Sequence, residues 1–231
     1  MTPPVHYRTG DLWGLSVMKF TLTYEGPLPA SGNKPKPAEV WRIRDDFHPQ
    51  LADLWDNHPA LKDVLARRKW PLGSGSIVLH SAHHSERRHS PVAATPSSAT
   101  SLDLCAPIEK YGAYFRPLVR ETFALHCGLK ILFLRKELPG RVYQGGDLDG
   151  RIKTIVDALT MPQHKEQVFA DASSPNPILC LMEDDSMLSG LDVQSERLLT
   201  GQNFSRDHVK LVVEVDVRVR QAAAYNQSFL G

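Results

Sequence analysis

The stretch "VKLVVEVDVRV" at residues 209–219 places an apolar side chain at every odd-numbered position. Its charged residues, Lys210, Glu214, Asp216 and Arg218, all stand at even-numbered positions. Successive side chains of a β-strand point to opposite faces, so this pattern predicts a strand with one buried face and one face in water. The chain is therefore expected to contain a sheet that leaves one side open to solvent at this strand.

Two other segments are also expected to be strands. "FALHCGLKILFLR" at 123–135 is apolar on both alternating faces, which indicates a central strand covered on both sides. "KFTLTY" at 19–24 separates large apolar residues from threonines with a period of two. Between Pro49 and Arg68, apolar residues recur at helical spacing, and Pro59 is well placed to start a second short helix. The chain thus mixes strands with short helices.

The composition limits the class of protein. The chain has 231 residues, 42% of them apolar, and a formal net charge of +1. This length suits one sizeable core, so one globular domain is expected, and any nucleic-acid surface has to be a local basic patch. Apolar runs fall short of the roughly 18 residues that cross a bilayer, so no membrane partner is expected. The cysteines are odd in number and form no CxxC pair, which favours a reducing, cytoplasmic location.

An acidic motif opens the stretch "GDLDGRIKTIVDAL". Asp147 and Asp149 stand around one leucine at the start of an expected helix, where either can cap the first turn. Asp149, Lys153 and Asp157 follow one another at intervals of four and share one exposed stripe. A second acidic cluster, "EDDSML", stands at 183–188. Taken singly, Asp149 and Lys153 could form a surface ion pair worth under about 1 kcal/mol. Converging carboxylates would instead favour a bound cation, and oxygen ligands select a hard ion such as Mg²⁺.

The complete pattern is D-L-D, a lysine four residues after the second aspartate, D-A-L and a downstream D-D pair. It is similar to the RusA-like family of Holliday junction resolvases. The resemblance covers residues 19–32 and 108–220. It implies an α/β, α+β-like fold with a small mixed sheet and flanking helices, assembled as a homodimer. It also implies a magnesium-dependent endodeoxyribonuclease that resolves Holliday junctions or other branched DNA in recombination and repair.

The same resemblance assigns roles to individual residues. Asp147, Asp149 and Asp185 are expected to bind Mg²⁺ or Mn²⁺, and Lys153 to be the basic residue that cleavage needs. The lysine ammonium could stabilise charge on the phosphoryl group or on the leaving oxygen. The neighbouring carboxylates that could support this centre are Asp184 and Asp157.

Basic side chains near the motif and in the loop after the first strand are candidates for contacts with the phosphates of branched DNA. They are Lys34, Lys36, Arg135, Lys136, Arg141 and Arg151. No nucleotide cofactor is expected, because "PLGSGS" lacks the Lys-Ser/Thr of a phosphate-binding loop. A symmetric homodimer would supply a second active site for the two equivalent strands of a junction. Its interface is expected at sheet edges, either at 19–24 or at the end of 209–219.

The chain is expected to divide into an N-terminal appendage at 1–18, the RusA-like domain at 19–220 and a C-terminal tail at 221–231. Within the domain, 31–105 would be an insertion after the first strand, and about 82–101 is too poor in large apolar residues to join a core. The insertion supports a second hypothesis. In it, a catalytically altered RusA-like protein acts as a DNA-binding or protein-interaction module.

Overall fold

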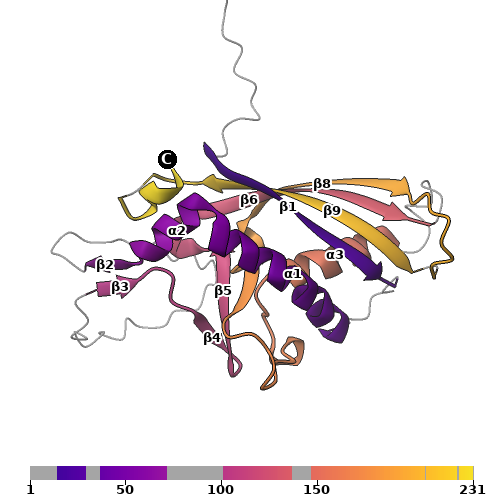
Figure 1. Cartoon of the computed structure of the whole chain (residues 1–231), viewed down its shortest axis with the longest axis horizontal. Coiled ribbons are helices and arrows are strands. Elements are labelled where there is room, and N and C mark those ends of the chain that lie inside the picture. The colour runs from indigo at the N-terminus through magenta and orange to yellow at the C-terminus, as the bar shows by residue number, and fades with distance from the viewer. Residues whose placement is uncertain are drawn as a thin grey trace, which may run out of the picture.

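The largest sheet of the protein has four strands, in the order β1-β9-β6-β8 (Figure 1). The computed structural model describes residues 15–29, 37–71, 101–136, 147–205, 207–222 and 224–230. The four strands are β1 (Leu15–Pro27), β9 (His208–Val219), β6 (Leu125–Arg135) and β8 (Leu188–Arg197). β1 and β6 run antiparallel to β9, whereas β8 runs parallel to β6. The sheet is therefore mixed.

The alternation that predicts β9 is confirmed. Its odd-numbered residues are at most 4% exposed, whereas Lys210 and Glu214 are exposed. β6 is an interior strand, as expected, but only its odd-numbered face is fully covered. Its other face carries the exposed Lys130 and the half-buried Leu132 and Leu134. β9 lies between β1 and β6, so the expectation that its end forms a free sheet edge is wrong.

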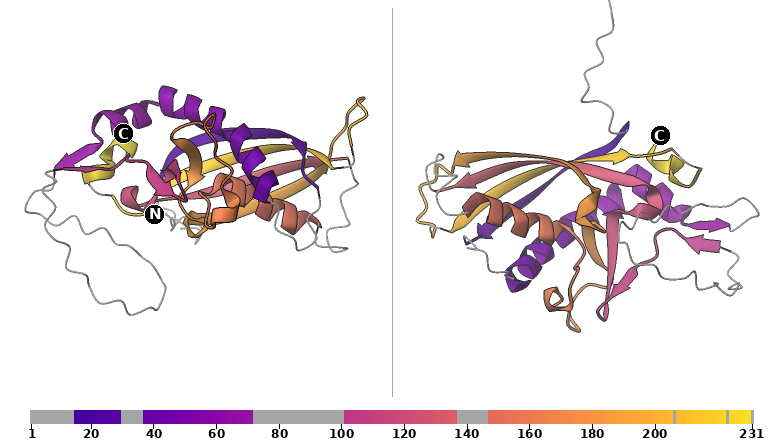
Figure 2. Two further views of the ribbon diagram at one scale, coloured as in Figure 1. Left: turned by 90° about the horizontal axis from the view of Figure 1, so that it is seen from below. Right: turned by 180° about the vertical axis from the view of Figure 1, so that it is seen from behind.

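Helices α1 and α3 lie on one side of the four-stranded sheet (Figures 1 and 2). The helices are α1 (Pro37–Asn57), α2 (Pro59–Ala66) and α3 (Asp147–Leu159). The prediction that a helix starts at Pro59 is confirmed. α1, however, begins well before Pro49, which sits exposed inside it. Its buried Val40, Ile43 and Phe47 continue the helical spacing upstream, and their burial outweighs the hydrogen bond that the proline cannot make.

Two smaller sheets flank the larger one. Strands β4 (Ile108–Lys110), β5 (Ala113–Val119) and β7 (Ile178–Met182) form a sheet in the order β4-β5-β7, with β7 parallel to β5. Strands β2 (Lys69–Pro71) and β3 (Ser101–Asp103) pair antiparallel. Short 3₁₀ turns complete the fold: η1 (Glu121–Phe123), η2 (Lys165–Gln167), η3 (Asp185–Met187) and η4 (Ala224–Phe229). The protein is of the α+β class.

The structure changes the expected domain limits. β1 begins at Leu15, and Met18 is buried, so residues 15–18 belong to the sheet rather than to an appendage. Phe229 is 3% exposed and packs on Phe123 at 5.3 Å between ring centroids, so the segment expected to be a C-terminal tail contributes to the core.

The segment expected to be an insertion is also part of the core where the structure describes it. Ile43 and Phe47 of α1 and Leu61 of α2 join the same buried cluster as the sheet residues. Their burial makes α1 and α2 integral to the domain. The segment at about 82–101, which is expected not to join the core, lies outside the described residues except for position 101. Within the described residues, no helix has both the length and the apolar character to cross a membrane.

Candidate functional site

A groove of about 800 Å³ runs between α3 and the strand β8. Its charged side chains are Asp149, Lys153 and Asp157 from α3 and Asp185 from η3. Its apolar lining is Leu148, Ile152, Val156, Leu188, Leu191 and Val193. Two acidic segments far apart in the sequence therefore meet at one apolar groove.

The helical repeat explains how α3 presents its charged residues. Residues four positions apart lie about 6 Å apart along a helix axis and stay near one face. Asp149 and Lys153 are exposed, and Asp157 is half-buried. The opposite stripe of α3 is anchored in the core through Ile155 and Leu159, which are 0% and 1% exposed. The helix begins at Asp147, so Asp149 lies inside its first turn, and the expectation that Asp149 could cap the helix is wrong.

The small sheet brings the second acidic segment to this helix. β7 is buried along its whole length, and Met182 pairs with Thr160 just after α3. The backbone N–H of Met161 donates to the carbonyl of Met182 at 2.9 Å. The chain leaving β7 therefore passes the C-terminal end of α3 before Asp185 reaches the groove.

Asp184 and Asp185 have different surroundings. The Asp184 carboxylate accepts a hydrogen bond from the backbone N–H of Ser186 at 2.9 Å and caps η3. Partial burial opposes ionisation of Asp184, but the hydrogen bonds from Ser186, together with Asp185 and the Lys110 ammonium, lower the pKa of this carboxyl. Asp184 is thus committed to its own turn, whereas Asp185 is exposed and lines the groove.

The charges in the groove act on one another. Burial raises the pKa of the Asp157 carboxyl; the Lys153 ammonium works against this rise, and the Asp185 carboxylate adds to it. An incoming cation would relieve the repulsion between Asp157 and Asp185. The groove therefore favours positive charge among its carboxylates.

A buried arginine fixes the C-terminal end of α3. Arg44 of α1 is 1% exposed, and its Nη2 donates to the carbonyls of Asp157 at 2.8 Å and Thr160 at 2.9 Å. A cation at the C-terminus of a helix also complements the helix dipole. The sequence patterns did not indicate a role for Arg44. The available signal was its position among the inward-facing residues of α1.

A second basic residue that was missed lies beside the acidic cluster. The ammonium of Lys110, at the end of β4, donates to the carbonyl of Pro162 at 2.9 Å and to Oε1 of Gln163 at 3.0 Å. Burial lowers the pKa of Lys110, while Asp184 and Glu183 favour its charged form. Lys110 thereby holds the loop after α3 near the acidic cluster.

Two of the basic residues expected to contact DNA are buried. Arg135 and Arg151 are each 2% exposed, so neither guanidinium is presented to a phosphate in this structure. Arg135 stands on the odd-numbered, covered face of β6, and Arg151 lies one turn before Ile155 on the inward stripe of α3. Nη2 of Arg151 lies 3.9 Å from Oδ1 of Asp207.

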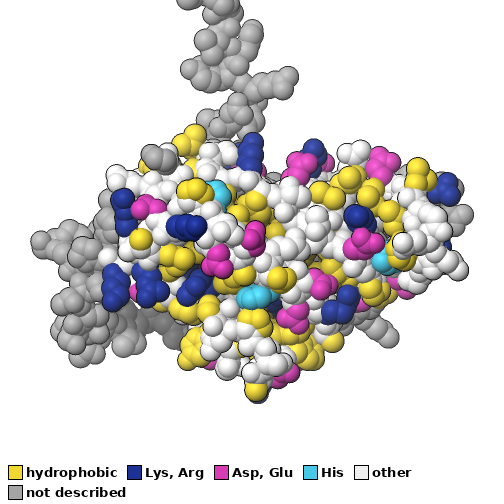
Figure 3. Space-filling view, in the orientation of Figure 1, with side chains coloured by type: hydrophobic (Ala, Val, Ile, Leu, Met, Phe, Trp, Pro, Cys, Tyr) yellow, Lys and Arg dark blue, Asp and Glu magenta, His cyan; other side chains and the backbone are white. Residues whose placement is uncertain are grey.

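The other expected DNA contacts have mixed outcomes. The Nζ of Lys136 donates to the carbonyl of Phe204 at 2.9 Å. Lys34, Lys36 and Arg141 lie outside the described residues. On the face shown in Figure 3, basic and acidic side chains are interspersed rather than gathered into one continuous basic surface.

The donor set of the groove partly matches the expected metal site. Asp149 and Asp185 supply carboxylate oxygens, which hard cations prefer. Among the side chains that the structure describes, no three of His, Cys, Asp or Glu converge closely enough to hold a metal ion. Asp147 begins α3, but its side chain is not among those described. A three-carboxylate site at this groove would therefore need Asp147.

Comparison with known proteins does not identify a family for the chain. No protein-family model matches the chain, and neither curated proteins nor solved structures show a significant similarity to it. The function has to be argued from the groove itself.

Proposed function

We propose that the chain is a metal-dependent endodeoxyribonuclease that cuts branched DNA, with the groove between α3 and β8 as its active site. One observation carries this proposal. Asp149, Lys153 and Asp185, which the RusA-like sequence pattern selects, line the same groove although two separate segments supply them. A pattern of surface ion pairs and turn residues would not require the two segments to meet.

The chemistry of phosphodiester cleavage fits these side chains. Asp149 and Asp185, with Asp147, would hold Mg²⁺ or Mn²⁺, and the bound ion would supply a nucleophilic water and neutralise charge on the phosphoryl group. Lys153 stands one turn after Asp149, where its ammonium can bind a non-bridging phosphate oxygen or stabilise the leaving oxygen. Asp157, beyond Lys153 on the same stripe, attracts that ammonium and so helps to keep it in the groove.

Branched DNA is the substrate class that the RusA-like pattern indicates, and we propose a homodimer as the acting species. A four-way junction offers two equivalent strands. One groove can serve only one strand at a time, so a two-fold assembly would supply the second active site.

The test is incubation with a synthetic four-way junction, a flap and a linear duplex, each with and without Mg²⁺. Cleavage of the branched substrates only when Mg²⁺ is present is the expected result. Junction binding without cleavage in either Mg²⁺ or Mn²⁺ would instead support the DNA-binding module. Neither binding nor cleavage of any of the three substrates would overturn both the nuclease and the DNA-binding module, and would leave the protein-interaction module of the second hypothesis.

Lys153 is expected to act in cleavage more than in binding. Lys153→Ala removes one exposed ammonium among several phosphate contacts, so junction affinity should fall only a few-fold, whereas the cleavage rate should fall on the order of a hundred-fold. Single-turnover cleavage and a gel-shift titration of the same junction measure the two effects. Equal losses in both would make Lys153 a binding residue.

A further inference from the structure

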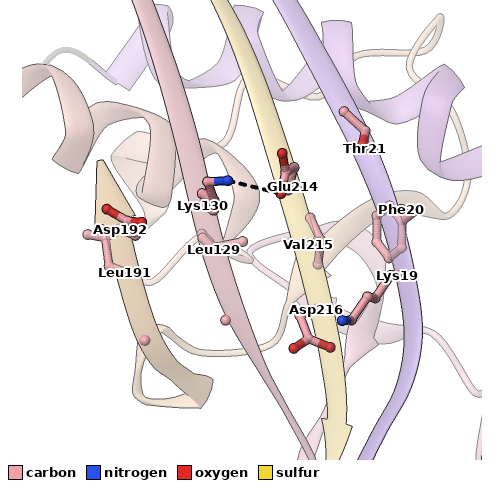
Figure 4. Close-up of a pocket in the computed structure, with 12 residues that line it drawn as sticks. Lys19, Phe20, Thr21, Leu129, Lys130, Leu191, Asp192, Glu214, Val215 and Asp216 are labelled. Carbon is pink, nitrogen blue, oxygen red and sulfur yellow. Dashed lines mark ion pairs between the residues drawn. The ribbon is translucent and has the colours of Figure 1, made fainter. Parts of the chain in front are cut away.

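The two edges of the four-stranded sheet differ in what lies beside them. β1 forms one edge, and β8, which carries Leu191, forms the other (Figures 1 and 4). At β1, Oε1 of Gln50 in α1 accepts a hydrogen bond from the backbone N–H of Thr23 at 2.9 Å, and Nε2 of Gln50 donates to the Thr23 carbonyl at 2.7 Å. Gln50 thus makes both bonds that a neighbouring strand would make, so the β1 edge is closed to another strand at this point.

The edge at β8 has no such cover within the described residues. β8 pairs with β6 on one side only, and most of its residues are exposed. A strand that is paired on one side leaves backbone N–H and C=O groups pointing outward on the other. β8 is 10 residues long and contains no proline, which would interrupt an added ladder of hydrogen bonds. This edge can therefore accept the backbone of another strand.

β8 also carries apolar side chains that α3 does not cover. Leu191 is in register with Leu129 of β6, and Val193 with Ile131. Leu129 and Ile131 are buried in the core, so Leu191 and Val193 point to the same side of the sheet as α3. Nevertheless, Leu191 is 46% exposed, Val193 is half-buried, and both line the groove. A strand added about 4.8 Å beyond β8 would therefore lie beside the groove and extend its apolar wall.

The charges of the groove determine which side chains an added strand can carry. The carboxylates of Asp149, Asp157 and Asp185 stand against the single ammonium of Lys153. A lysine or arginine on the incoming strand would reduce the repulsion among the carboxylates, whereas an acidic side chain would increase it. Because alternate side chains of a strand share one face, every second residue of the segment would meet the groove. The groove thus fits a segment that carries both apolar and basic residues on one face.

We propose that β8 is the docking edge for an extended segment of another protein, which joins the sheet as a fifth strand. On its groove face the segment carries apolar residues together with lysine or arginine. Its backbone bonds to the outer edge of β8, its apolar residues pack on Leu191 and Val193, and its cations pair with the carboxylates of the groove. In this mode of recognition, backbone hydrogen bonds supply affinity and alternate side chains supply specificity. Nucleic acid has no peptide edge and cannot make these bonds.

The docked segment would occupy the same groove as the proposed active site. Its cations would stand among the carboxylates that the proposed metal ion needs, so a docked segment would keep both the ion and DNA out of the groove. This regulatory consequence rests on the proposed function, whereas docking to β8 does not. The test therefore measures docking alone, in the absence of Mg²⁺ and DNA, and its outcome is independent of junction cleavage.

The probe is the synthetic peptide TVTKTVTRT with blocked ends, which places valine, lysine and arginine on one face and threonines on the other. NMR titration of the full chain should give a dissociation constant of about 100 µM. At about 1 mM peptide, hydrogen exchange should slow about ten-fold at alternate amides of β8 and stay unchanged in β1. The peptide TVTETVTET, which replaces the basic residues by glutamate, should not bind. No binding of the basic peptide at about 1 mM, or equal binding of the two peptides, would overturn the proposal.

N-methylated peptides test whether the backbone makes the contact. The N–H groups of successive residues in a strand point to opposite edges. Methylation of the threonines therefore removes the donors of one edge, and methylation of the remaining residues removes those of the other edge. Only one of these two peptides should bind. Equal affinities of the two, whether high or low, would overturn the proposal, because the contact would then not run through one backbone edge.

Two leucine variants locate the site. Leu191→Lys removes an apolar contact beside β8 and should weaken binding about ten-fold or more without lowering the melting temperature, because Leu191 is 46% exposed. Leu199→Lys makes the same change at a leucine that is 82% exposed in the loop after β8, and should bind as the wild type does. Equal affinities of the two variants would overturn the proposal. So would protection of every β8 amide without peptide, which would identify a second copy as the occupant if it rose with protein concentration, and a segment of the same chain if it did not.

Discussion

The two faces of β6 differ in burial, because one side of the strand packs in the core and the other carries side chains that reach solvent. The odd-numbered Leu129, Ile131 and Phe133 are at most 3% exposed and pack under α1 and α3. The even-numbered Lys130 is exposed, and Leu132 is only half-buried. Because adjacent residues of β6 lie on opposite faces, substitutions at neighbouring positions should change the stability of the protein by very different amounts.

The largest difference is expected between Ile131 and Leu132. Ile131→Ala removes a fully buried side chain and should lower the free energy of unfolding by about 4 kcal/mol. Leu132→Ala removes a half-exposed side chain and should cost under about 1 kcal/mol in the monomer. Urea denaturation at a concentration where the chain is monomeric measures both values. Similar costs at the two positions would show that the even-numbered side of β6 is covered within the monomer.

A smaller difference is expected between a buried and an exposed arginine. Arg44→Ala leaves the carbonyls of Asp157 and Thr160 without their charged donor and should cost about 3 kcal/mol. Arg67, 70% exposed, pairs with Asp63 one turn away, and Arg67→Ala should cost under about 1 kcal/mol. Thermal or urea unfolding of the two variants compares them directly. An Arg44→Ala variant as stable as Arg67→Ala would contradict the anchoring of α3 by α1.

The smallest expected effect is a change in pH dependence at Asp157. Burial raises the pKa of this carboxyl in the folded state, so between the unfolded and folded pKa values the folded protein holds a proton that the unfolded chain has lost. Stability from this group is therefore lost as the pH rises through that window. Asp157→Asn should flatten this part of the profile and leave stability at neutral pH unchanged or slightly higher.

Solvent screening of a half-buried group keeps the expected change at Asp157 to a fraction of a kcal/mol. Urea unfolding of wild type and variant from about pH 4 to about pH 7 would detect it. If stability changed with pH by the same slope in both proteins, the pH dependence would come from other groups. A variant less stable than the wild type at neutral pH would show that the ionised Asp157 is stabilising.

Sequence periodicity predicted β1, β6 and β9, because their burial follows from a period of two. It did not predict β8 or the strands of the two smaller sheets. It did not predict the start of α1, because Pro49 was interpreted as a boundary, whereas the buried Phe47 and Ile43 carry the helix through it. Arg151, which the sequence offers as a candidate for contact with DNA phosphates, is buried. Arg151 stands four residues before Ile155, and this spacing places it on the inward side of α3. A charged side chain can be buried only with partners such as Asp207, and the spacing of residues does not reveal such partners.

The part of the candidate site that lies on α3 could be predicted, because it depends on local sequence alone. The four-residue intervals from Asp149 to Asp157 predict a shared helix face, and the three residues line one groove. Asp185 lies at this groove because Met182 pairs with Thr160 and β7 pairs with β5. Both are contacts between segments that are distant in the sequence. The hydrogen bonds from Arg44 of α1 to the end of α3 also join segments that are distant in the sequence. Such contacts are set by the packing of the whole core.

The proposed active site is tested most directly by cleavage of a four-way junction in Mg²⁺ by three variants that each neutralise one carboxylate. Asp149→Asn and Asp185→Asn change the groove, whereas Asp192→Asn changes an exposed aspartate of β8 that does not line it. The account predicts that the first two lose cleavage by at least about a hundred-fold while unfolding at wild-type temperature, and that Asp192→Asn cuts at the wild-type rate. Cleavage retained by Asp149→Asn or Asp185→Asn, or lost equally in all three, would contradict it.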